Sequence, residues 1–344
     1  MSATGSGSGA GAGAGAGAGS GSGQADLNTL PATATSDRTG RTSISAHAAV
    51  RVDPTPDGGI RVSELRSQVP LVLRRTGTAD GRTADGYCGS DTLPYRYVPT
   101  ATVHLVNAAA GPLAGDRLRL DISVGAGVAL VLRTVAATVA LPGRGDRAGG
   151  GDGDDSGRGN RADLPSLFDV HADVGPDGAL AYLPEPTVAA RGCRHHMRAR
   201  IRLASTARLL WREEIVLGRF GEPAGSISCA LHVDVDVDVE GRGHDRHDRA
   251  GRSAMVRPLL RQELRLDPGT PGLDGPAVLG GARVTGSLLI AGPGPDGLGV
   301  APAVTDTFAL LPLAGPGVMI SALAPDTVTL RHALNTGRAM VAHW

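Results

Sequence analysis

The chain has 344 residues, which is long enough to bury a sizeable core, and its formal net charge is +0. This balance gives no electrostatic footprint of nucleic-acid or membrane binding, so neither partner is expected. Aromatic residues make up only 3% of the chain, so the core must be built from Leu, Val, Ile and Ala. Three widely spaced cysteines indicate a reducing compartment rather than a disulfide framework, and the cytoplasm is the expected location.

The first 45 residues are of low complexity. Residues 1–24 alternate Gly with Ala and Ser, and 28–45 are rich in Thr, Ser and Ala, which predicts a flexible coil. The segment lacks the basic start and apolar region of a signal peptide, and no long apolar run predicts a membrane span. We therefore expect a disordered tail at 1–45 and one β domain at 46–344, with flexible polar insertions at 143–163 and 241–254.

The stretch 111–141 organises the rest of the chain. Within it, Leu118, Leu120, Ile122 and Val124 alternate with polar residues, which is the period of a half-buried strand. Gly125 and Gly127 break this pattern, and an apolar run follows at 128–132. The stretch is predicted to form a β-hairpin.

The same strand–turn–strand pattern recurs twice downstream. Leu130, Leu180 and Leu209 occupy matching places, with separations of 50 and 29 residues. Removing the 21-residue polar insertion at 143–163 reduces the first separation to 29 as well. A period of this length predicts stacked units that bury a shared core.

Further strands and one helix are expected beyond the repeats. The segment 228–240 alternates cleanly and is predicted to pair with 255–267. Residues 326–341 form the plausible helix, with Asp326 as its cap. The predicted fold class is all-β, mainly antiparallel hairpins stacked into a helical-like solenoid scaffold, with one or two short helices near the C-terminus.

Several acidic residues and histidines are candidates for a metal path. Asp116 follows a glycine, Glu185 follows a proline, and Glu213 and Glu214 face opposite sides of one strand. An inward carboxylate among them is a hypothetical relay for a metal ion, although turns and solvated strands carry such residues routinely. His195 and His196 follow Cys193, but adjacent strand residues face opposite sides, which argues against one shared ion.

A second candidate lies in the cleanest alternating strand. It places His232, Asp234, Asp236 and Asp238 on one face, and His244 and His247 follow in the loop. Carboxylates two residues apart can hold a hard or borderline cation. The alternative, which we favour, is an edge strand whose charges prevent sheet-to-sheet association.

No catalytic arrangement is found in the sequence. A Gly-x-Ser-x-Gly elbow, a phosphate loop and a His-Glu-x-x-His motif are missing, and the chain has no lysine for Schiff-base chemistry. The sequence therefore predicts a protein that is not an enzyme.

Four motifs in order carry a family resemblance. The segment 111–121 is followed by a glycine-rich turn and by Arg-Thr-Val-Ala-Ala-Thr at 133–138. Leu-Pro-Glu-Pro-Thr-Val follows at 183–188, then Trp-Arg-Glu-Glu with Gly-Arg at 211–219, and Leu-Leu-Arg-Gln-Glu-Leu at 259–264. Together they resemble the urease accessory protein UreD (UreH) family over residues 46–344. Pro112, Ala114, Arg133 and the pair Val139-Ala140 depart from the family pattern, which marks a divergent member.

The resemblance implies a non-enzymatic chaperone for urease maturation. Members of the family are β-rich scaffolds that bind UreF, through it the GTPase UreG, and with them dock on apo-urease so that nickel reaches its active site. The resemblance implies no cofactor of the chain's own, and nickel is handled in transit. The alternative hypothesis is a β protein that stores or senses a divalent metal through the region 232–247.

Overall fold

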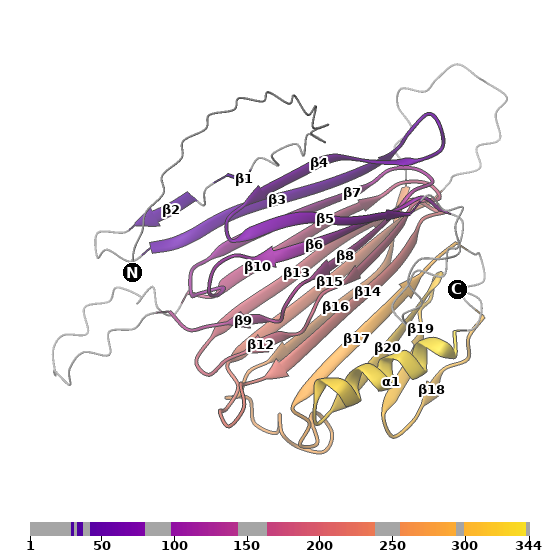
Figure 1. Cartoon of the computed structure of the whole chain (residues 1–344). Helices are drawn as coiled ribbons and strands as arrows, with labels where there is room; N and C mark the ends of the chain where they lie inside the picture. The colour runs from indigo at the N-terminus through magenta and orange to yellow at the C-terminus, as the bar shows by residue number, and fades with distance from the viewer. Residues whose placement is uncertain are drawn as a thin grey trace, which may run out of the picture.

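The computed structural model describes residues 29–30, 33–36, 42–79, 98–143, 164–237, 255–293 and 299–341. Within these ranges nearly all regular structure is strand, and the only helix is the last element (Figure 1). The elements are β1 (Thr29–Leu30), β2 (Thr33–Ser36), β3 (Thr42–Pro54), β4 (Ile60–Gln68), β5 (Leu71–Ala79), β6 (Thr100–Asn107), β7 (Arg117–Val124), β8 (Ala129–Thr134), β9 (Thr138–Ala140), β10 (Ser166–Val174), β11 (Ala179–Leu183), β12 (Thr187–Ala189), β13 (Arg194–Leu203), β14 (Arg208–Leu217), β15 (Ser226–Val237), β16 (Met255–Leu266), β17 (Val284–Ala291), β18 (Ala303–Val304), β19 (Phe308–Pro312), β20 (Gly317–Ala324) and α1 (Thr327–Ala339). The all-β class and the C-terminal helix are confirmed.

The strands form one large mixed sheet that is not closed and that folds over into two layers. Strand β4 makes the link, because it pairs with β3 in one layer and with β5 in the other. The layer that carries α1, called the helix layer here, contains β5, β6, β8, β9, β11, β12, β14, β17, β19 and β20. The second layer contains β3, β7, β10, β13, β15 and β16. Figure 1 shows α1 lying across the helix layer near β17 and β20.

The predicted repeat is confirmed by the strand register. In the helix layer Leu130, Leu180 and Leu209 are direct partners in the parallel ladder β8–β11–β14. In the second layer Val124 and Val174 are partners in β7–β10, and Val174 is the partner of Leu203 in β13. Each repeat therefore adds one strand to each layer in the same register.

The predicted hairpin at 111–141 is wrong in its pairing. Strand β7 pairs with β3 and β10, whereas β8 pairs with β6 and β11, so the two strands lie in different layers. The turn between them is an arch that carries the chain across the core. The physical reason is that both strands direct apolar side chains toward each other, such as Leu120 and Leu130, and bury them between the layers. Stacking along the repeats is consequently parallel, not antiparallel.

Antiparallel pairing occurs at the ends of the stack. Strand β15 pairs with β16 as the sequence predicts, and β17 pairs with both β14 and β20. At the other end β3 pairs with β4 and β5 pairs with β6. The hairpin component of the prediction therefore holds outside the repeats.

Successive arches stack on one another through backbone contacts. The Gly127 N–H donates to the Pro176 carbonyl at 3.0 Å, and the Asp177 N–H donates to Thr206 Oγ1 at 2.8 Å. A Cβ on Gly178 would lie 2.8 Å from the Gly125 carbonyl oxygen, so only glycine permits this approach. The arches thus fix the spacing between repeats.

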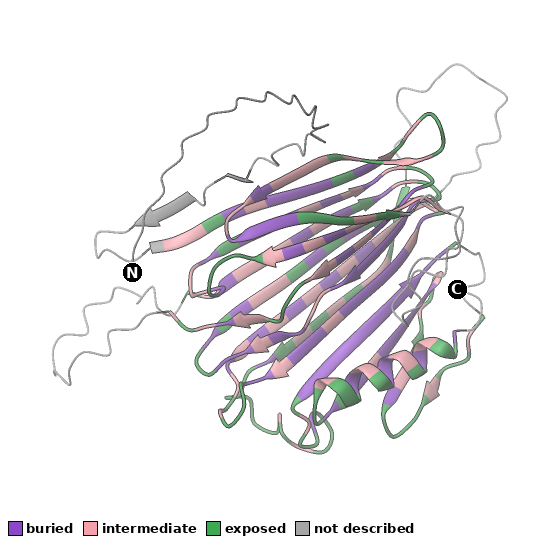
Figure 2. Ribbon diagram, in the orientation of Figure 1, coloured by how far each residue is buried: buried purple, intermediate pink, exposed green. Residues whose placement is uncertain are grey.

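Buried apolar side chains of the described residues form three clusters, the smallest of which includes Ile215, Ile227 and Leu279. Figure 2 shows buried residues along most of the strands. The main core lies between the layers and includes Leu73, Leu120, Leu180 and Trp211. A second core lies between the helix layer and α1, where Leu330 and Leu334 pack with the buried face of β17 and β20. Asp326 caps the helix as predicted, because its Oδ1 accepts from the Thr329 N–H at 2.8 Å.

The predicted tail at 1–45 includes residues that the structure describes as strands. Strands β1 and β2 lie inside the segment 1–45, and β2 pairs with β3. Residues 144–163 and 241–254 of the two insertions lie outside the described residues. No helix among the described residues is long and apolar enough to cross a membrane.

Candidate functional site

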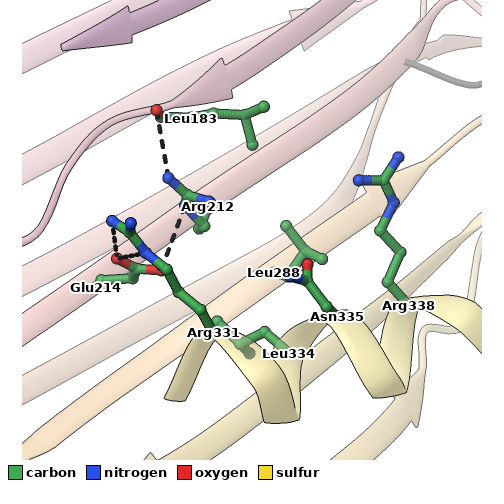
Figure 3. A pocket seen from close by; sticks show the side chains of 8 residues that line it. All are labelled: Leu183, Arg212, Glu214, Leu288, Arg331, Leu334, Asn335 and Arg338. Atoms are coloured by element: carbon green, nitrogen blue, oxygen red, sulfur yellow. Dashed lines mark hydrogen bonds and ion pairs between the residues drawn. The ribbon is translucent and has the colours of Figure 1, made fainter. Parts of the chain in front are cut away.

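The densest cluster of charged side chains lies beneath helix α1 (Figure 3). Strand β14 directs Arg212 and Glu214 to the side that α1 covers, and both are buried. Arg331 of α1 donates from Nη2 to Glu214 Oε2 at 2.9 Å and to Glu185 Oε2 at 2.7 Å. Arg212 lies 3.4 Å from Glu214 Oε1 through Nε and donates to the Pro184 carbonyl at 3.0 Å. A pocket beside this cluster is lined by Arg212, Glu214 and Arg331 together with Leu183, Leu288, Leu334, Asn335 and Arg338.

The charges in this cluster balance one another. Partial burial disfavours the charge on Arg331, but the hydrogen bonds that it donates to Glu214 and Glu185 outweigh this effect and raise the pKa of this guanidinium. Each carboxylate thus faces a guanidinium held in a fixed geometry. The cluster offers no nucleophile beside a base, and its evident effect is to hold α1 on the helix layer.

The opposite face of β14 carries a second carboxyl group, Glu213. It lies on the side of the main core, next to Trp211, whose Nε1 donates to Glu213 Oε1 at 3.1 Å. Burial raises the pKa of Glu213, and the bond from Trp211 only partly offsets this effect. Tyr182 stacks on Trp211 with ring centroids 4.1 Å apart. Glu213 and Glu214 therefore face opposite sides, as the sequence predicts, and Glu213 is the carboxyl that points between the layers.

Asp116 is a buried turn residue. Its Oδ1 accepts from the Ile44 N–H and its Oδ2 accepts from the Leu113 N–H, each at 2.9 Å. These bonds join the turn before β7 to the start of β3. Both carboxylate oxygens already serve backbone donors, so the structure gives Asp116 an architectural function.

The two adjacent histidines point to opposite sides of β13. His195 is 2% exposed, and its Nδ1 lies 2.8 Å from Ser166 Oγ. Its pKa falls to about 4, because burial disfavours the charged ring and the nearby His196 adds repulsion. His196 faces outward, so the two rings do not converge on one point, as expected.

The described part of the alternating segment belongs to β15, which pairs with β13 on one side and β16 on the other. The favoured interpretation of an edge strand is therefore wrong, because β16 covers that edge. His232 and Asp234 face outward, and Asp234 forms an ion pair with Arg261 of the neighbouring β16. Asp236 pairs with Arg202 at 2.8 Å. Asp238, His244 and His247 lie outside the described residues. Among the residues that are described, no group of three or more His, Cys, Asp or Glu side chains is placed to hold a metal ion.

The sequence places Gly218 and Arg219 in a family motif but predicts no contacts for the loop that follows β14. The Arg219 side chain donates two hydrogen bonds to Glu222, at 2.7 and 2.9 Å. Arg283 donates to the carbonyl oxygen of Leu217 at the end of β14 and to two carbonyl oxygens of the loop. Between Arg219 and Glu222, Phe220 is fully exposed. Gly218 and Gly221 have φ values of 80° and 75°, so the glycine pair around Phe220 was the available signal.

Comparison with known proteins identifies the family. Residues 45–344 match the UreD urease accessory protein family. The chain belongs to the UreD family. A protein of Frankia casuarinae named urease accessory protein UreD is 51% identical over 323 residues, which cover 89% of this chain and 92% of that protein. A protein of the same name from Frankia alni is 54% identical over 300 residues, covering 86% and 93%. A third, from Parafrankia, is 47% identical and covers 89% and 92%.

Membership in the UreD family confirms the resemblance drawn from the four motifs. The motif residues now have places in the fold. The segment 111–121 contains the Asp116 turn and most of β7. The stretch 211–219 contains most of β14 and Arg219, which binds Glu222. These family motifs therefore include turns and buried charges that shape the scaffold.

Proposed function

We propose that this UreD-family protein acts in urease maturation as a non-enzymatic scaffold. It binds UreF, through UreF it recruits UreG, and the assembly docks on apo-urease in the cytoplasm. Nickel passes to the urease active site within that assembly. The ion is the cargo of the complex, and the chain needs no resident cofactor.

The observation that carries the proposal is the family match over 300 residues of the chain, 45–344. Two features of the fold agree with it. The stacked layers form an extended scaffold with long outer faces, which is the kind of surface that protein partners use. The charged groups under α1 form ion pairs with one another, which supports a structural role for this cluster.

Co-expression tests this proposal directly. The tagged chain is produced with UreF of the same host and analysed by size-exclusion chromatography with light scattering. One sample contains a chelator and the other does not, and nickel is added to neither. A stoichiometric complex under both conditions is expected. A chain that elutes alone while UreF is present and soluble would overturn the scaffold function. Urease activation in a host that lacks the chain then tests its place in maturation.

Metal binding by the chain purified without UreF distinguishes the scaffold hypothesis from the metal-store hypothesis. A store binds a divalent cation tightly without partners and loses it when His244 and His247 are replaced. We expect no such tight binding to the chain alone, since Asp234 and Asp236 already bind arginines. Calorimetric titration of the free chain with Ni²⁺, before and after the double substitution, gives the answer.

A further inference from the structure

The outer face of the second layer carries ordered rows of charged side chains. Because the ladders are in register, side chains from five or six strands lie side by side in each row. One row runs from Arg117 on β7 through Leu167, His196 and Ser228 to Arg265 on β16. The rows beyond it mix both signs of charge.

His196 lies at the centre of a basic cluster. Arg194 and Arg198 stand two residues before and after it on the same face of β13. The pKa of His196 is lowered, first by burial and then by repulsion from Arg198, Arg265, Arg117 and Arg194. Its Nδ1 bonds Ser228 Oγ. The side chains Arg117, Arg194, Arg198, Arg265 and His196 are called the His196 patch below.

The exposed arginines of β13 differ in whether they form an ion pair with a carboxylate. Farther along the strand, Arg200 binds Asp169 at 3.3 Å and Arg202 binds Asp236 at 2.8 Å. In contrast, no carboxylate among the described residues forms an ion pair with Arg117, Arg194 or Arg198, all of which are exposed. Arg265 pairs with Glu263, which is itself exposed. The patch thus holds an excess of positive charge near one end of a face on which Arg200 and Arg202 have carboxylate partners.

The size of the patch indicates the kind of ligand. Arg117 and Arg265 are four strand intervals apart, which is about 19 Å at the usual spacing, and Arg194 and Arg198 are about 13 Å apart along the strand. A single small anion cannot contact all of these groups. An extended peptide spans about 3.3 Å per residue, so six residues cover the same width.

We propose that the His196 patch is a binding site for a carboxylate-rich segment of a partner protein. Its guanidinium groups provide paired N–H donors that match carboxylates. Asp169 lies in the same row as Arg198, and Asp121 and Asp173 lie in the two rows beyond it. These carboxylates would repel a continuous phosphate backbone. A peptide can place carboxylates over the patch and neutral or basic residues over those rows. The site therefore favours protein over nucleic acid, and it does not depend on the urease proposal.

Titration with a defined peptide tests the site. Fluorescein-labelled hexaglutamate is added to the full chain at low ionic strength and followed by anisotropy, because salt screens such contacts. Arg194→Gln with Arg198→Gln is compared with the matched pair Arg200→Gln with Arg202→Gln, which removes equal charge from the same face of the same strand. All four side chains are exposed, and thermal unfolding checks that each variant folds.

We expect saturable binding that weakens on the order of tenfold in the Arg194/Arg198 variant and by a much smaller factor in the matched variant. No binding of hexaglutamate would overturn the proposal. Equal losses in both variants would also overturn it, because they would mean general attraction to the face. Tighter binding of single-stranded oligothymidylate of equal charge would reassign the patch to nucleic acid.

Discussion

Arg331 of helix α1 donates from Nε to both carboxylate oxygens of Glu214 at 3.0 Å, across 117 residues of sequence. The Glu214 side chain is completely buried, whereas Arg331 remains 33% exposed. This pair joins the last element of the described chain to the central strand of the helix layer. It therefore adds a buried ion pair to the apolar contacts that hold α1 on this layer.

Replacing Arg331 with Met should destabilise the fold. The substitution leaves the buried Glu214 with Arg212 alone, and removing one partner of a buried ion pair costs about 3 kcal/mol. Urea unfolding measures this loss. His332→Ala, at the exposed neighbouring position on α1, is the control and should change stability by less than about 0.5 kcal/mol. A loss below about 1 kcal/mol for Arg331→Met would contradict the assigned function of the pair.

Asp116→Ala should destabilise the chain, because two partly buried backbone N–H groups lose their acceptor. Each unsatisfied donor costs about 1–3 kcal/mol. Asp116→Asn should cost less, since its amide oxygen still accepts one of the bonds. Thermal unfolding of both variants, with the exposed Asp173→Ala as the control, gives the order. An Asn variant as unstable as the Ala variant would show that charge, and not hydrogen bonding, is what the site needs.

Gly225→Ala should disturb the turn between β14 and β15. A Cβ there would lie 2.4 Å from the Ala190 carbonyl oxygen and 2.6 Å from Cys193 Sγ. Relief requires backbone movement, and we expect a loss of about 1–3 kcal/mol. Gly269→Ala is the matched control, because the nearest atom to its Cβ is 3.5 Å away. If both variants unfold at the same temperature, the close packing at Gly225 is unimportant.

The free energy of unfolding should decrease as the pH is lowered, because the buried His195 resists protonation in the folded chain. The folded pKa of this ring is about 4, below the value of 6.5 for the free side chain, so the unfolded chain binds the proton first as pH falls. Its contribution is complete above pH 6.5, declines between 6.5 and about 4, and is level below that. The total change is about 3 kcal/mol at most. His195→Gln should flatten this part of the curve of unfolding free energy against pH, and an unchanged slope would refute the assignment.

Much of the fold could be predicted because each repeat has a recognisable pattern of apolar and polar residues along the sequence. In-register parallel stacking keeps Leu130, Leu180 and Leu209 at equal offsets, so the sequence period is also the structural one. The hairpin error arose because Gly125 and Gly127 mark a turn in either case. A turn within a sheet and an arch between layers share the same glycine signal, and only the partners of β7 and β8 distinguish them.

The candidate site was harder to predict, because its contacts span long sequence separations. Glu185 and Glu214 were recognisable as acids near prolines and strands, but nothing local indicates that Arg331 lies between them. The His196 patch also depends on register, since Arg117 and Arg265 come from distant strands. Only the Arg194, His196 and Arg198 alternation on one face was visible in the sequence.

The antiparallel strands at both ends of the stack have a consequence for self-association. A parallel stack with an open final repeat offers a template on which another copy can continue the same pattern, as in a fibril. Here β16 and β17 pair antiparallel with β15 and β14, the strands of the last repeat. At the other end β4 pairs antiparallel with both β3 and β5. Strand β16 also carries Pro258, which cannot donate to a neighbouring ladder. The ends of the stack therefore do not present the parallel pattern of the repeats to a second copy.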